Sequence, residues 1–315
     1  MEKVIDETGL MPKESALAAL HEAVAAYNAE RGRVTNTLYV NMVLLFGGYV
    51  VLAGIFAYIA FTEIDKNIVG IVLGLLFFGG TVVWRVAQAP SKRFQQDLRD
   101  RMLPLVFGFI DEVQYGHGVE PRFMGAMPGK ELVARDRSEH GDMIAGRHEG
   151  LAFTLSETEM STGSGKSRST TFKGIIFHFV RDEEFPGLLL AARKPNSVQL
   201  FFRDLFGGSS MPLVTSGNPE LDASHEFRTD RPDAATPIVQ GALVKALDYL
   251  STEWRDDVVR LALRRRDCYL LLPSKKNFFE LPPVDTPIDF DRHLRPMIRD
   301  IVTLLATAKL VSKIS

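Results

Sequence analysis

Two apolar segments separated by a short polar link dominate the N-terminal part of the chain. Residues 38–61 contain no charged side chain, and neither do residues 68–84. A transmembrane helix needs about 20 apolar residues to cross a hydrocarbon core about 30 Å thick. The first segment meets that length, and the second is close to the lower limit. Because only residues 62–67 join them, the pattern predicts a transmembrane hairpin of two antiparallel helices.

Basic residues near the ends of the apolar segments predict the orientation of this hairpin. Lys66 is the one basic residue in the link, whereas arginines and lysines flank the two outer ends. Cytoplasmic flanks are enriched in Lys and Arg, so both termini are expected in the cytoplasm of a two-span cell-membrane protein. The flanking basic residues are Arg31, Arg33, Arg85, Lys92, Arg93, Arg99 and Arg101.

Glycines within the second apolar segment suggest close helix packing. Gly70 and Gly74 form a G-x-x-x-G pattern, in which small residues let helix backbones approach each other in lipid. Two interpretations remain open: packing within the hairpin, or a seam between two copies of the chain. Neither span contains a charged side chain, which disfavours a transporter or channel.

Amphipathic helices are predicted on both sides of the hairpin. Residues 13–31 carry an apolar 3-4-3 pattern, and residues 85–115 repeat an apolar position at every fourth residue after a break at Pro90. We expect an N-terminal amphipathic helix within 1–37 and a juxtamembrane stalk helix over 85–115, kinked at Pro104. Four basic residues of the stalk are candidates for lipid headgroup contacts, although a topology signal is the preferred explanation: Lys92, Arg93, Arg99 and Arg101.

From about Gly116 onward the pattern changes to a mixture of strands and helices. Apolar residues alternate with polar ones in several short segments, which is the period of a half-buried strand. Thr236-Pro237 predicts a helix start, and another helix is expected over 288–311. We therefore expect a cytoplasmic α+β domain at 116–315, with an antiparallel sheet or small barrel covered by helices. Expected strands are 151–155, 172–180, 187–191, 198–202, 258–263 and 267–272.

Charge and cysteine content narrow the function classes. The formal net charge of the 315-residue chain is −2, which gives no basic excess for nucleic-acid binding. Cys268 is the single cysteine, so no disulfide forms within the chain. Because it adjoins an apolar run, we expect a buried structural thiol.

The sequence contains no recognisable catalytic or metal-binding motif. Residues 161–167 end in Gly-Lys-Ser, but Met160 stands where a phosphate-binding loop needs glycine. We therefore expect a Ser- and Gly-rich hairpin loop there. The seven histidines show no zinc spacing, so no metal, cofactor or catalytic residue is assigned. Arg264-Arg265-Arg266 is interpreted as a solvated hairpin turn, with an anion contact as the alternative.

Several segments of the domain resemble a known family. Two carry an F-x-G pattern, one resembles a stretch with two consecutive acids before a helix, and two resemble a closing strand with a proline-rich exit. They are 172–176, 185–187, 227–235, 269–273 and 279–282. Together with the hairpin, they resemble the uncharacterised bacterial membrane family catalogued as domain of unknown function 3137, over roughly residues 90–300. The sequence departs from that pattern at Arg231 and Thr236-Pro237. The resemblance implies architecture and location but no reaction.

Three functions are compatible with these observations. The first is a non-catalytic binding or regulatory module, tethered to the lipid bilayer and recognising a protein partner on the cytoplasmic side. The second is a membrane-surface enzyme, which would require a cleft that gathers several of five side chains. The third is a homo-oligomer assembled through the hairpin. The five side chains are Glu157, His178, Arg193, His225 and Asp230.

Overall fold

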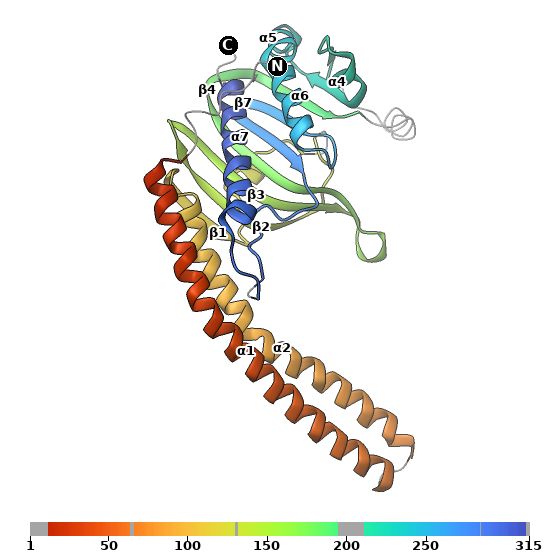
Figure 1. Cartoon of the computed structure of the whole chain (residues 1–315). Helices are drawn as coiled ribbons and strands as arrows, with labels where there is room; N and C mark the ends of the chain where they lie inside the picture. The colour runs from red at the N-terminus through yellow and green to blue at the C-terminus, as the bar shows by residue number, and fades with distance from the viewer. Residues whose placement is uncertain (1–11, 64–65, 130–131, 195–210, 284, 313–315) are drawn as a thin grey trace. The chain divides into compact units, whose positions relative to one another are not determined.

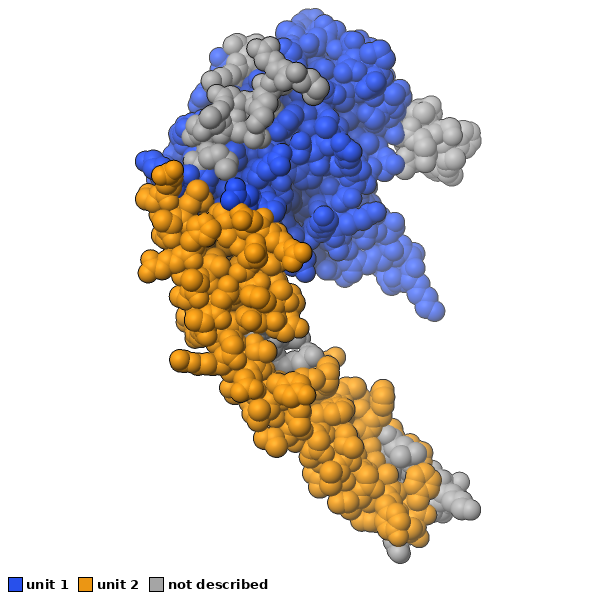
Figure 2. All heavy atoms as spheres, in the orientation of Figure 1, with its two compact units in different colours: residues 1–13, 107–280, 295–315 blue, residues 14–106, 281–294 orange. Residues whose placement is uncertain are grey.

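A computed structural model describes residues 12–63, 66–129, 132–194, 211–283 and 285–312. The chain divides into two compact units, shown in different colours in Figure 2. Unit 1 comprises residues 1–13, 107–280 and 295–315, and unit 2 comprises residues 14–106 and 281–294.

Two long antiparallel helices form most of unit 2 (Figure 1). Helix α1 spans Glu14–Glu63, so the predicted N-terminal helix and first apolar helix are one uninterrupted element. Helix α2 spans Lys66–Val106. The expected break at Pro90 is wrong, because α2 continues through it. The predicted stalk helix over 85–115 is also too long, because α2 ends at Val106.

Side chains from the middle of α1 contact α2 closely. The Tyr49 hydroxyl donates a hydrogen bond to the carbonyl oxygen of Leu76. A Cβ added at Gly79 would lie 3.1 Å from the Tyr49 hydroxyl oxygen, and one added at Gly80 would lie 3.2 Å from the same ring. The absence of side chains at these two glycines therefore makes room for the tyrosine.

Helix α1 carries the surface expected of a membrane-spanning helix. It is the one helix among the described residues that is long and apolar enough to cross a membrane. Large apolar side chains are exposed along α1 between Tyr39 and Phe61, and Phe61 is 67% exposed. In α2 the described apolar stretch is shorter, Gly74–Ala87, although Phe77 is 79% exposed there. Water does not favour such a surface, whereas lipid does.

The start of α1 is packed within unit 2, as its apolar pattern predicts. Leu20, Val24 and Tyr27 are buried. Asn28 forms two hydrogen bonds with the backbone of Ile288: its Nδ2 donates to the carbonyl oxygen across 2.8 Å, and its Oδ1 accepts from the amide across 2.9 Å. The segment 281–294 is thereby fixed alongside the first turns of α1.

One antiparallel sheet organises unit 1 (Figure 1). Its strand order is β1-β2-β3-β4-β6-β5, and β7 pairs with the opposite side of β4. The expected α+β class with an antiparallel sheet is confirmed. The strands are β1 (Asp111–His117), β2 (Arg137–His148), β3 (Leu151–Thr162), β4 (Ser169–Arg193), β5 (Leu213–Val214), β6 (His225–Thr229) and β7 (Arg260–Pro273).

Strands β4 and β7 are longer than the sequence pattern indicated. The segments expected as separate strands at 172–180 and 187–191 both belong to β4. Likewise, 258–263 and 267–272 are joined in β7, so the predicted turn at Arg264–Arg266 is wrong. Irregular pairing between Val180 and Leu188 lets β4 continue through polar residues that resemble a loop. The expected strand at 198–202 lies outside the described residues.

Both faces of the sheet are covered. Ile176 and Phe177 are neighbours in β4 and point to opposite faces, yet both are fully buried. Ile176 packs in a cluster with Phe123, Met127 and other side chains of the segment before β2, which includes a short 3₁₀ turn, Arg122–Gly125. Helix α7, Arg295–Ser312, also contacts β4 and buries an apolar stripe (Figure 1).

The remaining helices of unit 1 follow β5 and β6. They are α4 (Pro219–Ser224), α5 (Pro232–Ile238) and α6 (Val244–Glu253), with a π-helical turn at Val239–Leu243. The expected helix start at Thr236 is wrong, because Pro232 occupies the first turn and Pro237 lies inside α5. A proline within a helix removes one backbone hydrogen bond, and the wider turn that follows accommodates this loss.

Candidate functional site

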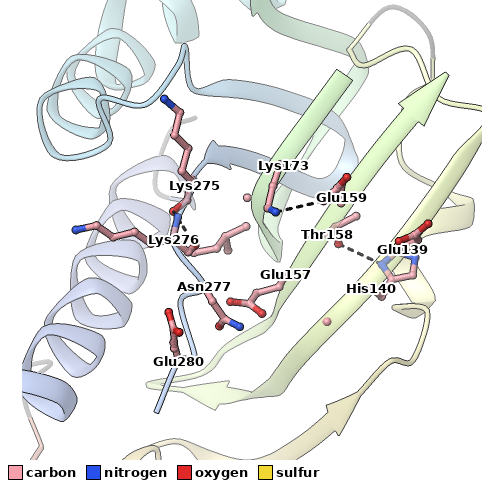
Figure 3. A pocket seen from close by; sticks show the side chains of 14 residues that line it. Glu139, His140, Glu157, Thr158, Glu159, Lys173, Lys275, Lys276, Asn277 and Glu280 are labelled. Atoms are coloured by element: carbon pink, nitrogen blue, oxygen red, sulfur yellow. Dashed lines mark hydrogen bonds and ion pairs between the residues drawn. The ribbon is translucent and has the colours of Figure 1, made fainter. Parts of the chain in front are cut away.

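A polar cleft lies where β2, β3 and β4 meet the chain that leaves β7 (Figure 3). Its volume is about 530 Å³. The sheet contributes residues 139–141, 157–159 and 173–175, and the segment after β7 contributes 274–277 and Glu280. All these residues belong to unit 1.

Glu157 forms the floor of the cleft and projects from β3 toward Asn277 (Figure 3). Its Oε1 accepts hydrogen bonds from the backbone amides of Phe278, across 2.5 Å, and Phe279, across 3.3 Å. Burial raises the pKa of Glu157, while these amides oppose the rise by stabilising the carboxylate. The carboxylate thus fastens the segment after β7 to the sheet.

Gly141 makes room for this carboxylate. A Cβ added at Gly141 would lie 2.9 Å from Glu157 Oε2, closer than such atoms approach in proteins. The pairing of β2 with β3 is irregular here, between His140 and Met143. Because the pairing is irregular and Gly141 has no side chain, the Glu157 carboxylate fits into space that a side chain on β2 would otherwise fill.

His140 and Thr158 form the polar wall beside Glu157. His140 Nδ1 lies 3.1 Å from the Thr158 hydroxyl. Burial lowers the pKa of His140; Glu120 acts in the opposite direction, and Arg135 lowers it further. The imidazole is therefore neutral at pH 7 and offers one donor and one acceptor.

Ion pairs line the rim. Lys173 Nζ lies 3.4 Å from Glu159 Oε2, and Arg168 Nη2 lies 2.7 Å from Glu139 Oε1. The hydrogen bond from Arg168 holds the pKa of the Glu139 carboxyl below its usual value. Such exposed pairs contribute little to stability, but they give the rim both signs of charge.

A buried acid supports the cleft from β2. Asp142 is 1% exposed, and its Oδ1 accepts a hydrogen bond from the Tyr115 hydroxyl across 2.5 Å. His117 Nδ1 lies 2.7 Å from the same oxygen. These contacts join β1 to β2 at the level of the cleft, and the backbone amide of Asp142 also bonds Glu157. The carboxylates here are therefore engaged by the protein itself.

The side chains of the cleft are mostly engaged in hydrogen bonds and ion pairs with the protein itself. In the described part of the chain, no group of three His, Cys, Asp or Glu side chains is placed to hold a metal ion. Glu157 is held by backbone amides, and His140 contacts Thr158 rather than a nucleophile activated by a third group. What the cleft offers is a dense set of donors, acceptors and opposite charges.

The five side chains required for an enzyme site do not converge. The cleft contains Glu157, and a separate pocket contains Asp230. His178 Nε2 bonds Asp267 Oδ1 across 2.8 Å, and burial lowers the pKa of this histidine. The structure therefore does not gather these five side chains in one cleft.

The other two candidates have structural partners of their own. Arg193 bonds Asp257 across 3.1 Å. His225 is buried; its Nε2 donates to the Val259 carbonyl oxygen across 2.8 Å, and its Nδ1 lies 2.9 Å from the Ser224 hydroxyl. The sequence pattern alone did not reveal the cleft, since its walls come from distant segments.

The structure gives different outcomes for the glycine and basic candidates in unit 2. Gly70 and Gly74 face open space, whereas Gly79 and Gly80 face Tyr49. The close contact between α1 and α2 thus lies at the second glycine pair, and a seam between copies at Gly70 and Gly74 stays a prediction. Arg99 and Arg101 lie in the described part of α2, but the side chains of Lys92 and Arg93 lie outside the described residues.

The two F-x-G motifs have a physical explanation in the structure. Gly174 has a φ of +152°, and a Cβ there would lie 2.1 Å from the Leu272 carbonyl oxygen. A Cβ at Gly187 would lie 2.2 Å from Asp230 Oδ1. Each glycine therefore permits a close approach of another segment to β4, and no larger residue replaces it without displacement.

The fold defines an α+β domain built on one antiparallel sheet, joined to a unit of two long helices. Residues 170–313 match the model of a family described as protein of unknown function, DUF3137. The resemblance predicted from the sequence is confirmed over this segment. No curated protein and no solved structure matches the chain.

Proposed function

We propose that this chain is a two-span membrane protein whose α+β domain lies in the cytoplasm and binds a protein partner through the polar cleft. In this proposal the domain is a non-catalytic binding or regulatory module. The observation that carries it is the cleft itself, which presents both signs of charge and unused polar groups around a rigid floor.

Membrane anchorage is supported by the surface of α1. Its apolar part carries large exposed side chains, and residues 38–61 contain no charge. The absence of charge from residues 68–84 supports a second span, although the described apolar stretch of α2 is shorter. The excess of basic residues outside the link supports a cytoplasmic location for both termini.

Partner binding is supported by the side chains along the segment after β7. Lys275, Lys276 and Glu280 line the cleft and have no side-chain bond to any other described residue. Opposite charges spaced along one groove suit a polypeptide that carries both signs, because complementary charges set register and selectivity. The hydrogen bonds that Glu157 accepts hold this segment in place, so less conformational entropy is lost when a partner binds.

Topology reporters test the anchorage. A compartment-sensitive reporter pair would be fused after Ser315 and, separately, inserted at Asp65. We expect a cytoplasmic signal at Ser315 and an external signal at Asp65. An external signal at Ser315, or the same side for both sites, contradicts the two-span arrangement.

Site-specific crosslinking in cells tests the cleft. A photoreactive amino acid at Asn277 lies within the cleft, and one at Gln114, exposed on β1, provides the control. We expect a discrete adduct from Asn277 that is absent from Gln114 and is lost when Lys276→Glu and Glu280→Lys reverse the rim charges. Equal adducts from both positions, or adducts unaffected by charge reversal, contradict partner binding at the cleft.

A further inference from the structure

An irregularity in the pairing of β7 with β4 places two neighbouring arginines of β7 in one pocket. Successive side chains of a regular strand point to opposite faces of the sheet. Arg265 departs from this rule with a φ of +54°, and the pairing with β4 is irregular opposite it, at Phe185 and Leu188. Arg264 and Arg265 consequently line the same concave surface.

This pocket is separate from the cleft. It has a volume of about 520 Å³, and it shares no lining residue with the cleft. Pro128 and Gly129 form one wall, and the irregular part of β4 over 184–188 forms another. Asp230 completes the lining. All these residues belong to unit 1.

The two guanidinium groups are available for a ligand. Arg264 Nη1 donates to the Ala126 carbonyl oxygen across 3.1 Å, which orients this side chain and leaves other N–H groups unused. Arg265 is exposed and has no hydrogen-bond or ion-pair partner within the described ranges. An arginine at positive φ is uncommon, since glycine occupies this backbone region without strain. Strained residues of this kind concentrate at binding sites.

The two acids of the pocket do not neutralise the arginines. Asp230 Oδ1 accepts the backbone N–H of Leu188 across 2.7 Å, so it serves to hold the irregular part of β4. Glu184 is exposed in that part of the strand. Neither acid forms an ion pair with Arg264 or Arg265 in the described part of the chain.

We propose that Arg264 and Arg265 form a binding site for a phosphate group. Guanidinium groups bind phosphate oxygens bidentately, and two of them supply more donors than a carboxylate accepts. A phosphate monoester presents three terminal oxygens, which matches this excess of donors. The phosphate belongs either to a soluble phosphate ester or to a lipid headgroup, and both present the same chemistry to the site.

Equilibrium dialysis tests the site with the full-length protein in phosphatidylcholine nanodiscs and radiolabelled inorganic phosphate as the probe. The central variant is Arg265→Gly, which removes the guanidinium and suits the positive φ, so the fold is retained. The matched control is Arg137→Gln, which removes an exposed strand arginine of the same unit outside this pocket.

Arg265→Gly is expected to weaken phosphate binding roughly tenfold, the effect of losing one charge-assisted hydrogen-bond pair. Arg137→Gln is expected to bind as the wild type does. Arg265→Lys is expected to fall between them, because it keeps the charge and loses the fork of donors. Unchanged binding in Arg265→Gly, an equal loss in Arg137→Gln, or no phosphate binding at all overturns the proposal.

Competition then identifies the source of the phosphate. Displacement of the probe by glycerol phosphate, but not by phosphatidic acid placed in the nanodisc, assigns a soluble ester. The reverse pattern assigns a lipid headgroup. Failure of both competitors while the probe binds indicates that the arginines hold a bare ion only, which contradicts a phosphate-ester site. None of these outcomes depends on partner binding at the cleft, so the two proposals fail independently.

Discussion

The backbone amide of Phe278 donates to Glu157 Oε1 across 2.5 Å and joins residues 121 positions apart. The bond connects the middle of β3 to the chain that leaves β7. Phe279 shares the same oxygen, and its ring lies edge-on to Phe107 with centroids 5.9 Å apart. One carboxylate therefore fixes the position of the cleft wall that follows β7, with an apolar contact beside it.

Replacing Glu157 is expected to loosen that wall. Glu157→Ala leaves the amide of Phe278 without its acceptor, which costs about 1–3 kcal/mol of stability, whereas the amide of Phe279 keeps Asn277 Oδ1. Hydrogen exchange read by mass spectrometry should show faster exchange in peptides that contain 274–280. Glu159→Ala provides the control, because that side chain bonds only Lys173 and Thr170 at the rim. Unchanged exchange in Glu157→Ala would contradict the anchoring role.

A second prediction concerns the close approach at Gly174. Gly174→Ala is expected to destabilise the protein by about 3 kcal/mol, since the new Cβ would overlap the backbone of β7. Thermal unfolding of the full-length protein in nanodiscs gives the measurement. Gly125→Ala is the matched control, because a Cβ there meets nothing within 4 Å. Equal melting temperatures for the two variants would show that the strands separate without cost.

The sequence predicted the elements whose pattern is local. Alternation over 172–180 identified part of β4, and the spacing of Leu20 and Val24 identified the buried face of α1. The pattern failed where tertiary pairing overrides local preference. Arg264–Arg266 resembled a turn because three charged residues interrupt two apolar runs, yet pairing with the irregular part of β4 keeps them in β7.

The cleft was hidden from the sequence for a related reason. Glu157 is one of the five candidate side chains that the sequence offers, but its acceptor role depends on amides far along the chain. Backbone amides are not specific to any residue type, so no sequence motif marks the amides that bind Glu157. The need for glycine at position 141 is likewise apparent only from the position of Glu157 Oε2 in the structure.

Cys268 should be chemically inert in the folded protein. Its side chain is fully buried, as the apolar run around it predicted, and burial raises the pKa of the thiol. Because the thiolate is the reactive form, alkylation by iodoacetamide should be slower by orders of magnitude in the native protein than in denaturant. Ser164→Cys, exposed in the β3–β4 loop, gives the positive control. Rapid native labelling of Cys268 would contradict the packing of β7 against β4.

Asp300 in α7 gives the fold a measurable dependence on pH. Burial raises the pKa of this carboxyl from 3.8 to about 6; Glu253 adds to the rise, whereas Arg299 and Lys276 oppose it. The folded state therefore holds the proton more tightly than the unfolded state. The resulting stability is fully present below pH 3.8 and is lost as the pH rises through about 6.

Asp300→Asn removes this dependence because the amide stays uncharged. At 1.36 kcal/mol per pH unit, the variant should exceed the wild type in stability by up to about 3 kcal/mol above pH 7. The difference in melting temperature should grow between pH 5 and pH 6 and level off above pH 7, and Asp182→Asn, an exposed carboxyl in β4, is the control. A difference that stays constant across this range would show that Asp300 is already ionised in the folded protein at pH 5, because only a carboxyl that releases its proton within the range produces the slope.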